Sequence, residues 1–153
     1  MTASATAPLR LLALDQDDLE VISAALQDAL TRIGDIRWER EAGRLTIVFN
    51  RLRWECAEAP EARVRTAIQF GCVRSVRSRN LRQSAPDAVV QLLAIAFTPK
   101  AAPAGAVILT FADGGDLELE VECVDAALAD VSQPWGPARR PAHDGSPDDV
   151  AEV

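Results

Sequence analysis

The sequence contains little of what enzymes commonly use for acid–base or nucleophilic chemistry. It has one histidine, His143, and no tyrosine. A Ser–His or Cys–His pair needs an imidazole fixed within hydrogen-bond reach of the nucleophile. His143 lies in a stretch rich in Pro, Gly, Asp and Ser, which we predict to be disordered. We therefore expect no histidine-based catalysis and assign no catalytic residue.

Cysteines are few and badly placed for a cofactor or a covalent framework. Cys56, Cys72 and Cys123 are odd in number and widely spaced, with no Cys-x-x-Cys pair. This spacing argues against a disulfide framework and a zinc site, and we predict neither metal nor cofactor. Cys72 and Cys123 lie in apolar strand contexts and are interpreted as small core residues.

Targeting and membrane signals are also lacking. Met1 to Pro8 has no basic region followed by an apolar stretch, so it does not resemble a secretory signal. The longest apolar run, Leu92 to Phe97, is too short to span a bilayer. We expect a cytoplasmic location and no membrane partner, and the sequence leaves the oligomeric state open.

Charge is unevenly distributed along this acidic chain. The net charge is −7 and the pI is near 4.7, which argues against tight nucleic-acid binding. Residues 37–82 nevertheless hold 11 Arg and 5 Glu, whereas residues 113–153 hold 11 acidic residues and 2 Arg. Such asymmetry can create a local positive field on an acidic protein.

Period-two patterning dominates what the chain does contain. Leu117, Leu119, Val121 and Cys123 alternate with three glutamates, and the turn at 113–116 predicts a hairpin of strands 106–112 and 116–123. Further strands are predicted at 9–14, 36–38, 64–79 and 89–97, the last being apolar enough to be covered on both faces. One or two helical turns are predicted within 124–131.

A long helix is predicted at residues 16–32. Asp15 suits the N-cap with Asp18 three residues later, and Leu14 and Leu19 match a hydrophobic staple. The apolar stripe of this helix consists of Leu19, Ile22, Leu26, Leu30 and Ile33.

The strand that follows residue 44 changes its apolar parity. Leu45, Ile47 and Phe49 share one face, but Leu52, Trp54 and Cys56 have the opposite parity. A β-bulge near Asn50 produces such a change, and we predict one here, with Trp54 buried.

Together these elements predict an α+β fold. We expect an antiparallel curved sheet or partial barrel of about seven strands, with one long N-terminal helix packed on it. Residues 1–8 and 136–153 are predicted to be flexible tails around a single domain at 9–135. A pleckstrin-homology-like roll is a possible relative, although the N-terminal helix does not belong to that plan.

Several segments carry a resemblance to a known family. They are Leu9–Asp15, Asn50–Glu55, Val73–Arg79, Leu93–Phe97 and Phe111–Gly115 followed by Val121–Cys123. In order and spacing they resemble a bacterial domain-of-unknown-function family, number 2948, over about residues 9–135. The resemblance implies a small cytoplasmic bacterial protein of unassigned activity, and it carries over no catalytic residue, cofactor or substrate.

Arginines form the strongest candidate binding site. The candidate set is Arg51, Arg53, Arg74, Arg77 and Arg79. Such a cluster could grip a carboxylate or phosphate bidentately, whereas the alternative is cross-strand pairing with Glu118, Glu120 and Glu122. Our first hypothesis is a non-enzymatic binding or adaptor domain for a protein or small anionic partner. Alternatives are a histidine-independent enzyme using carboxylates and arginine, and weak binding of single-stranded RNA.

Overall fold

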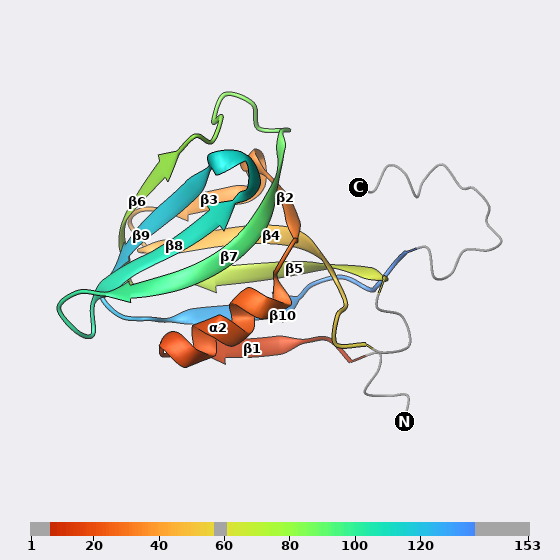
Figure 1. Ribbon diagram of the computed structural model, residues 1–153, viewed down its shortest axis with the longest axis horizontal. Helices are drawn as coiled ribbons and strands as arrows, with labels where there is room; N and C mark the ends of the chain where they lie inside the picture. Colours follow the sequence, from red (N-terminus) through yellow and green to blue (C-terminus); the bar gives the residue numbers. More distant parts are fainter. Residues whose placement is uncertain (1–6, 57–60, 137–153) are drawn as a thin grey trace.

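A computed structural model of the protein describes residues 7–56 and 61–136, and within them it contains a mostly antiparallel sheet of ten strands and one α-helix (Figure 1). The predicted tail at 1–8 lies largely outside the described residues, and the predicted tail at 136–153 does so except for Gly136. The elements are β1 (Arg10–Ala13), α2 (Gln16–Ala25), β2 (Leu30–Arg32), the 3-10 turn η1 (Ile33–Asp35), β3 (Ile36–Glu39), β4 (Arg44–Leu52), β5 (Arg63–Phe70), β6 (Val73–Arg79), β7 (Val89–Pro99), β8 (Gly105–Phe111), the 3-10 turn η2 (Ala112–Gly114), β9 (Asp116–Val121) and β10 (Ala126–Asp130).

The sheet follows one continuous path but does not close. Its strand order is β1-β10-β5-β4-β2-β7-β8-β9-β6, and β3 also pairs with β4. The α+β character and the antiparallel sheet are thus as predicted. The prediction of about seven strands was too low, and the helix is short, with ten residues, rather than long.

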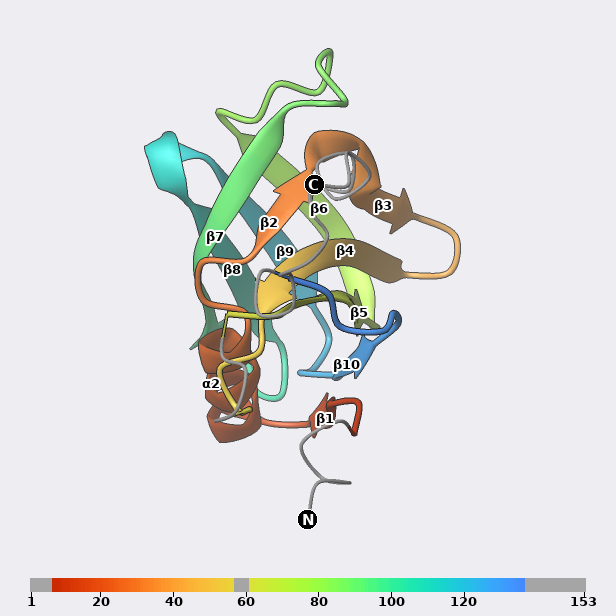
Figure 2. The ribbon, with the colours of Figure 1, turned by 90° about the vertical axis from the view of Figure 1, so that its right-hand side faces the viewer.

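The three-residue strand β2 joins two halves of the sheet. Leu30 pairs with Asn50 of β4 and also with Gln91 of β7. One half contains β1, β10, β5, β4 and β3, and the other contains β7, β8, β9 and β6. Figure 2 shows β7 and β8 on the left and β4, β5 and β10 on the right, so that the two halves face each other as layers. Their inward side chains form one core.

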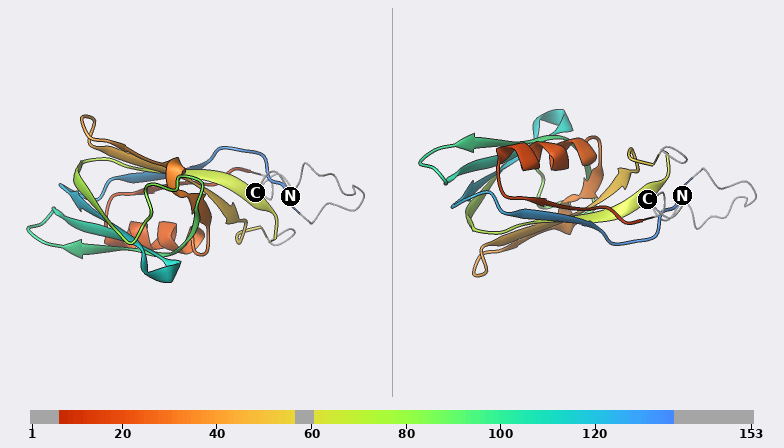
Figure 3. Two further views of the ribbon diagram at one scale, coloured as in Figure 1. Left: turned by 90° about the horizontal axis from the view of Figure 1, so that it is seen from above. Right: turned by 90° about the horizontal axis from the view of Figure 1, so that it is seen from below.

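Helix α2 covers one of the two open sides between these layers. It packs against β7 and β1, and Figure 3 shows it between the two layers. Its buried residues are Leu19 and Ile22, and Leu26 follows at the C-cap with no exposed surface. Asp15 is the N-cap, and its carboxylate accepts a hydrogen bond from the Asp18 N–H at 2.8 Å, as the sequence predicted. Leu14, however, is exposed, so the predicted staple is absent.

The helix ends seven residues before the predicted boundary. Asp28 has a positive φ of 68°, and its N–H donates to the Leu92 carbonyl of β7 at 2.8 Å. Thr31 then donates its hydroxyl proton to the Val48 carbonyl at 2.7 Å. These contacts hold residues 30–32 as a strand. The apolar spacing of Leu26, Leu30 and Ile33 fits a helix, but a bend and a short strand also keep such residues turned inward.

The hairpin of β8 and β9 is confirmed. Leu109 pairs with Leu117, and the turn contains Asp113 and Gly114 with φ values of 71° and 88°. These positive values are the reason for the Asp-Gly sequence, because glycine adopts them freely and aspartate tolerates them.

Two other strand predictions and one helix prediction need correction. Residues 64–79 form two strands, because Cys72 has a φ of 57° and turns the chain between β5 and β6. Residues 126–130 form β10, which pairs with both β1 and β5, instead of helical turns. Strand β7 is central in the sheet, but only Leu92 and Ile95 are buried, so it is not covered on both faces.

Candidate functional site

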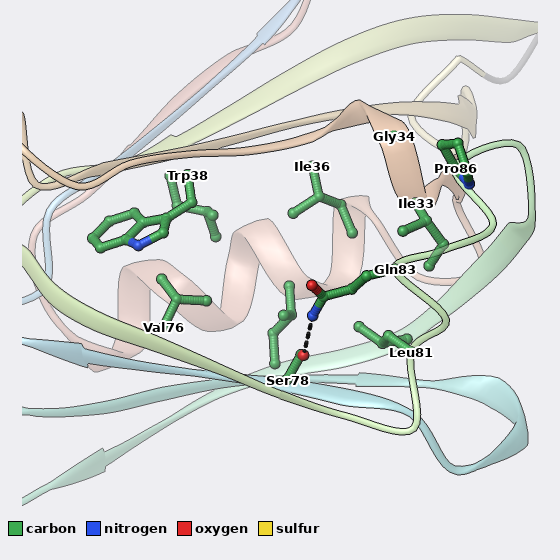
Figure 4. Close-up of a pocket in the computed structure, with 11 residues that line it drawn as sticks. Ile33, Gly34, Ile36, Trp38, Val76, Ser78, Leu81, Gln83 and Pro86 are labelled. Atoms are coloured by element: carbon green, nitrogen blue, oxygen red, sulfur yellow. Dashed lines mark hydrogen bonds between the residues drawn. The ribbon is translucent and has the colours of Figure 1, made fainter.

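An apolar pocket opens between β3 and β6, on the side of the layers that α2 does not cover. Among the described strands β3 pairs with β4 and β6 pairs with β9, and no pairing joins β3 to β6. The pocket has a volume of about 370 Å³. Figure 4 shows Trp38 and Ile36 on one side of it and Val76 and Ser78 on the other, with α2 visible behind. The pocket therefore extends from the surface toward the core between the two halves of the sheet.

Backbone hydrogen bonds hold both ends of this opening. At one end the Val73 N–H donates to the Gly43 carbonyl at 2.9 Å, which ties the β3–β4 turn to the start of β6. At the other end the Gly34 N–H donates to the Pro86 carbonyl at 2.8 Å. A Cβ on Gly34 would lie 3.1 Å from Pro86, so glycine permits this close approach. The width of the pocket is thus fixed by main-chain contacts rather than by side chains alone.

The lining of the pocket is apolar with one polar pair. The Gln83 side-chain amide donates to the Ser78 hydroxyl at 2.7 Å across the opening, as Figure 4 shows. Among the residues that the structure describes, none of those lining the pocket carries an ionisable side chain: they are Ile33, Gly34, Ile36, Trp38, Leu45, Val76, Ser78, Leu81, Gln83, Pro86 and Leu117. The pocket can accept apolar surface and one or two hydrogen bonds, but its own residues supply no general acid or base.

A second, polar hollow lies on the outer face of β3 and β4. Its volume is about 490 Å³, and it contains Asp35, Arg37, Glu39 and Arg44. Arg44 Nε donates to Glu39 Oε1 at 2.9 Å. Asp35 lies 3.5 Å from Arg32. Opposite charges at these distances partly satisfy one another at the surface.

The arginines of β6 form a ladder of exposed ion pairs with β9. Arg77 contacts Glu118 at 3.1 Å and Arg79 contacts Asp116 at 2.7 Å, because Arg77 and Glu118, and Arg79 and Asp116, are register partners. Arg74 lies 3.5 Å from Glu122. The hydrogen bond and the charge of Asp116 raise the pKa of Arg79. The strand pairing thus provides the cross-strand partners that the alternative interpretation of these arginines requires.

Arg51 lies elsewhere, on β4, and is fully buried. Its side chain has no exposed surface, and Asp130 beside it has 3%. The guanidinium donates to both oxygens of Asp130, at 3.0–3.2 Å, and to both oxygens of Glu55, at 2.8 and 2.9 Å. It also donates to the Thr66 hydroxyl at 3.0 Å and to the Leu52 carbonyl at 3.0 Å. Every N–H of the guanidinium group is close to an acceptor, as a buried charge requires.

This buried network connects strands that are far apart in the sequence. Asp130 of β10 also accepts hydrogen bonds from the Thr66 hydroxyl of β5 at 2.7 Å and from the Leu9 N–H at 2.8 Å. Burial alone lowers the pKa of Arg51, but hydrogen bonds and charges from Glu55 and Asp130 raise it overall. Burial alone raises the pKa of Glu55, and its contacts with Arg51 lower it overall. Both shifts favour the charged forms, so Arg51 and Glu55 form an ion pair at neutral pH.

The prediction of a β-bulge near Asn50 is wrong. Pairing of β4 with β5 runs without a register shift from Leu45 to Leu52. Arg51 continues the inward series begun by Leu45, Ile47 and Phe49, and Arg53 beyond the strand is also buried, at 5%. The side chains of β4 keep alternating between the inner and outer faces, but Arg51 takes an inward position where an apolar residue was expected. The apolar pattern in the sequence therefore changes although the strand is regular.

The structure separates the five candidate arginines into two groups. Arg51 on β4 and Arg53 just after its end are buried, whereas Arg74, Arg77 and Arg79 are exposed on β6. Among the described strands β6 pairs with β9 and not with β4. Whether the exposed group binds an anion stays a prediction. Glu55, which was not among these candidates, contacts Arg51 at 2.8 Å.

The structure also corrects the predictions for Trp54 and for the cysteines. Trp54 is 49% exposed rather than buried, because the strand ends at Leu52. Cys72 is exposed and Cys123 is half-buried, whereas Cys56 is the buried cysteine. Trp135 forms a bridge with Arg63, which holds the chain after β10 against β5.

Comparison with protein-family models gives a match over most of the chain. Residues 9–143 match the model described as protein of unknown function (DUF2948). The chain belongs to this family. The search of curated proteins and the search of solved structures each found no match. Membership of DUF2948 confirms the resemblance found in the sequence and brings no activity, ligand or site residue with it.

Sequence reasoning missed the pocket altogether. Its walls come from β3, η1, the 80–88 connection and β6, which are adjacent only because the sheet curves. Ser78 lies within the predicted strand 64–79, and Gln83 lies between that strand and the one predicted at 89–97. No sequence signal places these segments next to Trp38 without knowledge of the sheet topology.

In the part of the chain that the structure describes, no helix has the length and apolar character needed to cross a membrane.

Proposed function

We propose that the protein is a binding domain whose ligand is a small, mainly apolar molecule held in the pocket between β3 and β6. The observation that carries this proposal is the apolar lining of a pocket of about 370 Å³ at an opening between the two halves of the sheet. Small-molecule sites typically enclose about 300–1,000 Å³ and combine apolar walls with a few polar groups. Ser78 and Gln83 supply such groups here.

The same lining favours binding over catalysis at this place. Trp38, Ile36 and Val76 offer dispersion and apolar contact, and the described residues of the pocket walls include no ionisable group that could transfer a proton. A ligand with an apolar body and one hydrogen-bonding group, which replaces the Ser78–Gln83 hydrogen bond, fits this chemistry. A bacterial source and a cytoplasmic location remain predictions from the sequence.

The proposal is tested with a neutral, environment-sensitive apolar dye such as Nile red. Ser78 is exposed at the mouth of the pocket, so Ser78→Phe fills the opening without removing a core side chain. We expect this variant to weaken dye binding about tenfold or more, which corresponds to at least about 1.4 kcal/mol. Fluorescence titration of the full chain measures the affinity.

The matched control is Ser75→Phe on the same strand. Ser75 does not line the pocket, and its hydroxyl donates to Glu120 on the β9 side at 3.2 Å. This variant adds the same aromatic group and is expected to bind the dye as the unmodified protein does. Failure of the unmodified protein to bind the dye, or equal weakening by the two substitutions, would contradict the proposal.

A further inference from the structure

Two cysteines lie together at one end of the β6–β9 pair. Val73 is the register partner of Val121, and the Glu122 N–H donates to the Cys72 carbonyl at 2.9 Å. The Gly71 N–H donates to the Asp125 carbonyl at 2.8 Å. The connection between β5 and β6 therefore runs alongside residues 122–125, and Cys72 is next to Cys123 although they are far apart in the sequence.

The two thiols differ in exposure but share a polar surface environment. Cys72 is exposed and Cys123 is half-buried. The Cys72 thiol interacts with the Cys123 thiol, and Cys72 Sγ lies 3.9 Å from Asp125 Oδ2. The hydrogen bond with Cys123, then burial, then the charges of Cys123, Asp125 and Glu122 raise the pKa of Cys72 to about 11.

We propose that Cys72 and Cys123 are a modification site at which a hydroperoxide converts two thiols into one intramolecular disulfide. The exposed Cys72 sulfur attacks one peroxide oxygen, the O–O bond breaks, and Cys72 becomes a sulfenic acid while one water is released. The Cys123 thiol then loses its proton and attacks the Cys72 sulfur, which forms the S–S bond and releases a second water. With hydrogen peroxide, two thiols and one peroxide give one disulfide and two waters, so the thiol pair loses two electrons and the peroxide gains them.

The environment of Cys72 makes this reaction slow at neutral pH. The thiolate is the nucleophile, and the hydrogen bond with Cys123, burial and the charges of Cys123, Asp125 and Glu122 disfavour it, in that order. The rate of the reaction rises with pH as more thiolate forms.

The disulfide would tie down the wall of the pocket. It joins the β5–β6 connection to the β9–β10 connection. Cys72 directly precedes Val73, whose N–H donates to the Gly43 carbonyl at one end of the pocket. A covalent link here fixes the start of β6 and restricts the unfolded chain, so the oxidised protein is expected to melt at a higher temperature than the reduced protein.

The experiment treats the reduced protein, residues 1–153, with hydrogen peroxide and follows it by thiol titration and peptide mass mapping. We expect the number of reactive thiols in the denatured protein to fall from three to one, with a peptide that links Cys72 to Cys123. Cys72→Ser and Cys123→Ser should each abolish the link. Cys56→Ser is the control and should retain it, because Cys56 is buried elsewhere.

A second variant tests the chemistry rather than the fold. Asp125→Asn keeps the shape of the side chain and removes the carboxylate charge beside Cys72, so disulfide formation should become several-fold faster at neutral pH. Peroxide treatment that yields only higher oxidation of Cys72, or only links between different molecules, would overturn the proposal. An unchanged rate in Asp125→Asn would overturn the assigned role of the carboxylate.

Discussion

Arginine is used in two opposite ways in this molecule. Arg51 is completely buried and its guanidinium contacts two carboxylates, a hydroxyl and a carbonyl from several parts of the chain. Arg74, Arg77 and Arg79 are largely exposed and each contacts one carboxylate on the neighbouring strand. A buried charge that loses its partner keeps its full desolvation cost, whereas an exposed one is stabilised by water. The same kind of ion pair therefore has very different consequences in the two places.

The largest expected effect comes from removing the buried guanidinium. Arg51→Met keeps the apolar length of the side chain but leaves Asp130 buried without its cation, so we expect the free energy of unfolding to fall by about 3–5 kcal/mol. Urea unfolding at neutral pH measures the change. Asp130→Asn in the same background should cost less than it does alone, because the two substitutions share one network. A loss as small as that of an exposed ion pair would remove the distinction between the two groups.

A smaller, pH-dependent effect is expected at the rim of the buried network. The pKa of Glu55 is lowered in the folded protein, so its contribution to stability is present above the ordinary carboxyl range and is lost as the pH falls through the folded pKa. Glu55 is 39% exposed, which reduces the contribution at neutral pH to about 1 kcal/mol. Glu55→Gln should be less stable than the unmodified protein at neutral pH, and the two should converge in acid. Urea midpoints across the acid range provide the measurement, and a gap that does not narrow would contradict the assignment.

The smallest effect on stability is expected on β6. Replacing Arg74, Arg77 and Arg79 together by Ala should leave the melting temperature nearly unchanged, because these pairs are exposed and screened by salt. The same variant tests the anion hypothesis, with inorganic phosphate as the probe in calorimetry. Phosphate binding that disappears in the variant would support an anion site on this strand. Failure of the variant to fold would show that the three arginines have a structural role comparable with that of Arg51.

What the sequence could predict depended on whether the signal was local. The Asp-Gly turn of β8–β9 and the Asp15 cap are set by residues close together, and both are confirmed. The end of α2 depends on Leu92 and Val48, which meet Asp28 and Thr31 only in the folded chain. Local pattern alone therefore overestimated the helix.

Arg51 is the clearest case in which a sound rule led to a wrong conclusion. Alternation correctly placed Leu45, Ile47 and Phe49 on one face, but a charged residue at the next inward position was interpreted as a change of parity. Its partners, Asp130 and Thr66, lie on other strands, so nothing near Arg51 in the sequence other than Glu55 indicated burial. The pocket between β3 and β6 escaped prediction for the same reason, since its walls meet only through the topology.

The pairing of the first strand with the last has a consequence for how the molecule is made. Strand β1 bonds to β10, and the Leu9 N–H meets Asp130 across a separation of 121 residues. During synthesis β1 lacks this partner until residues 126–130 have left the ribosome. Such distant closure slows folding, so a chain interrupted before residue 126 would present β1 and one edge of β5 to other molecules.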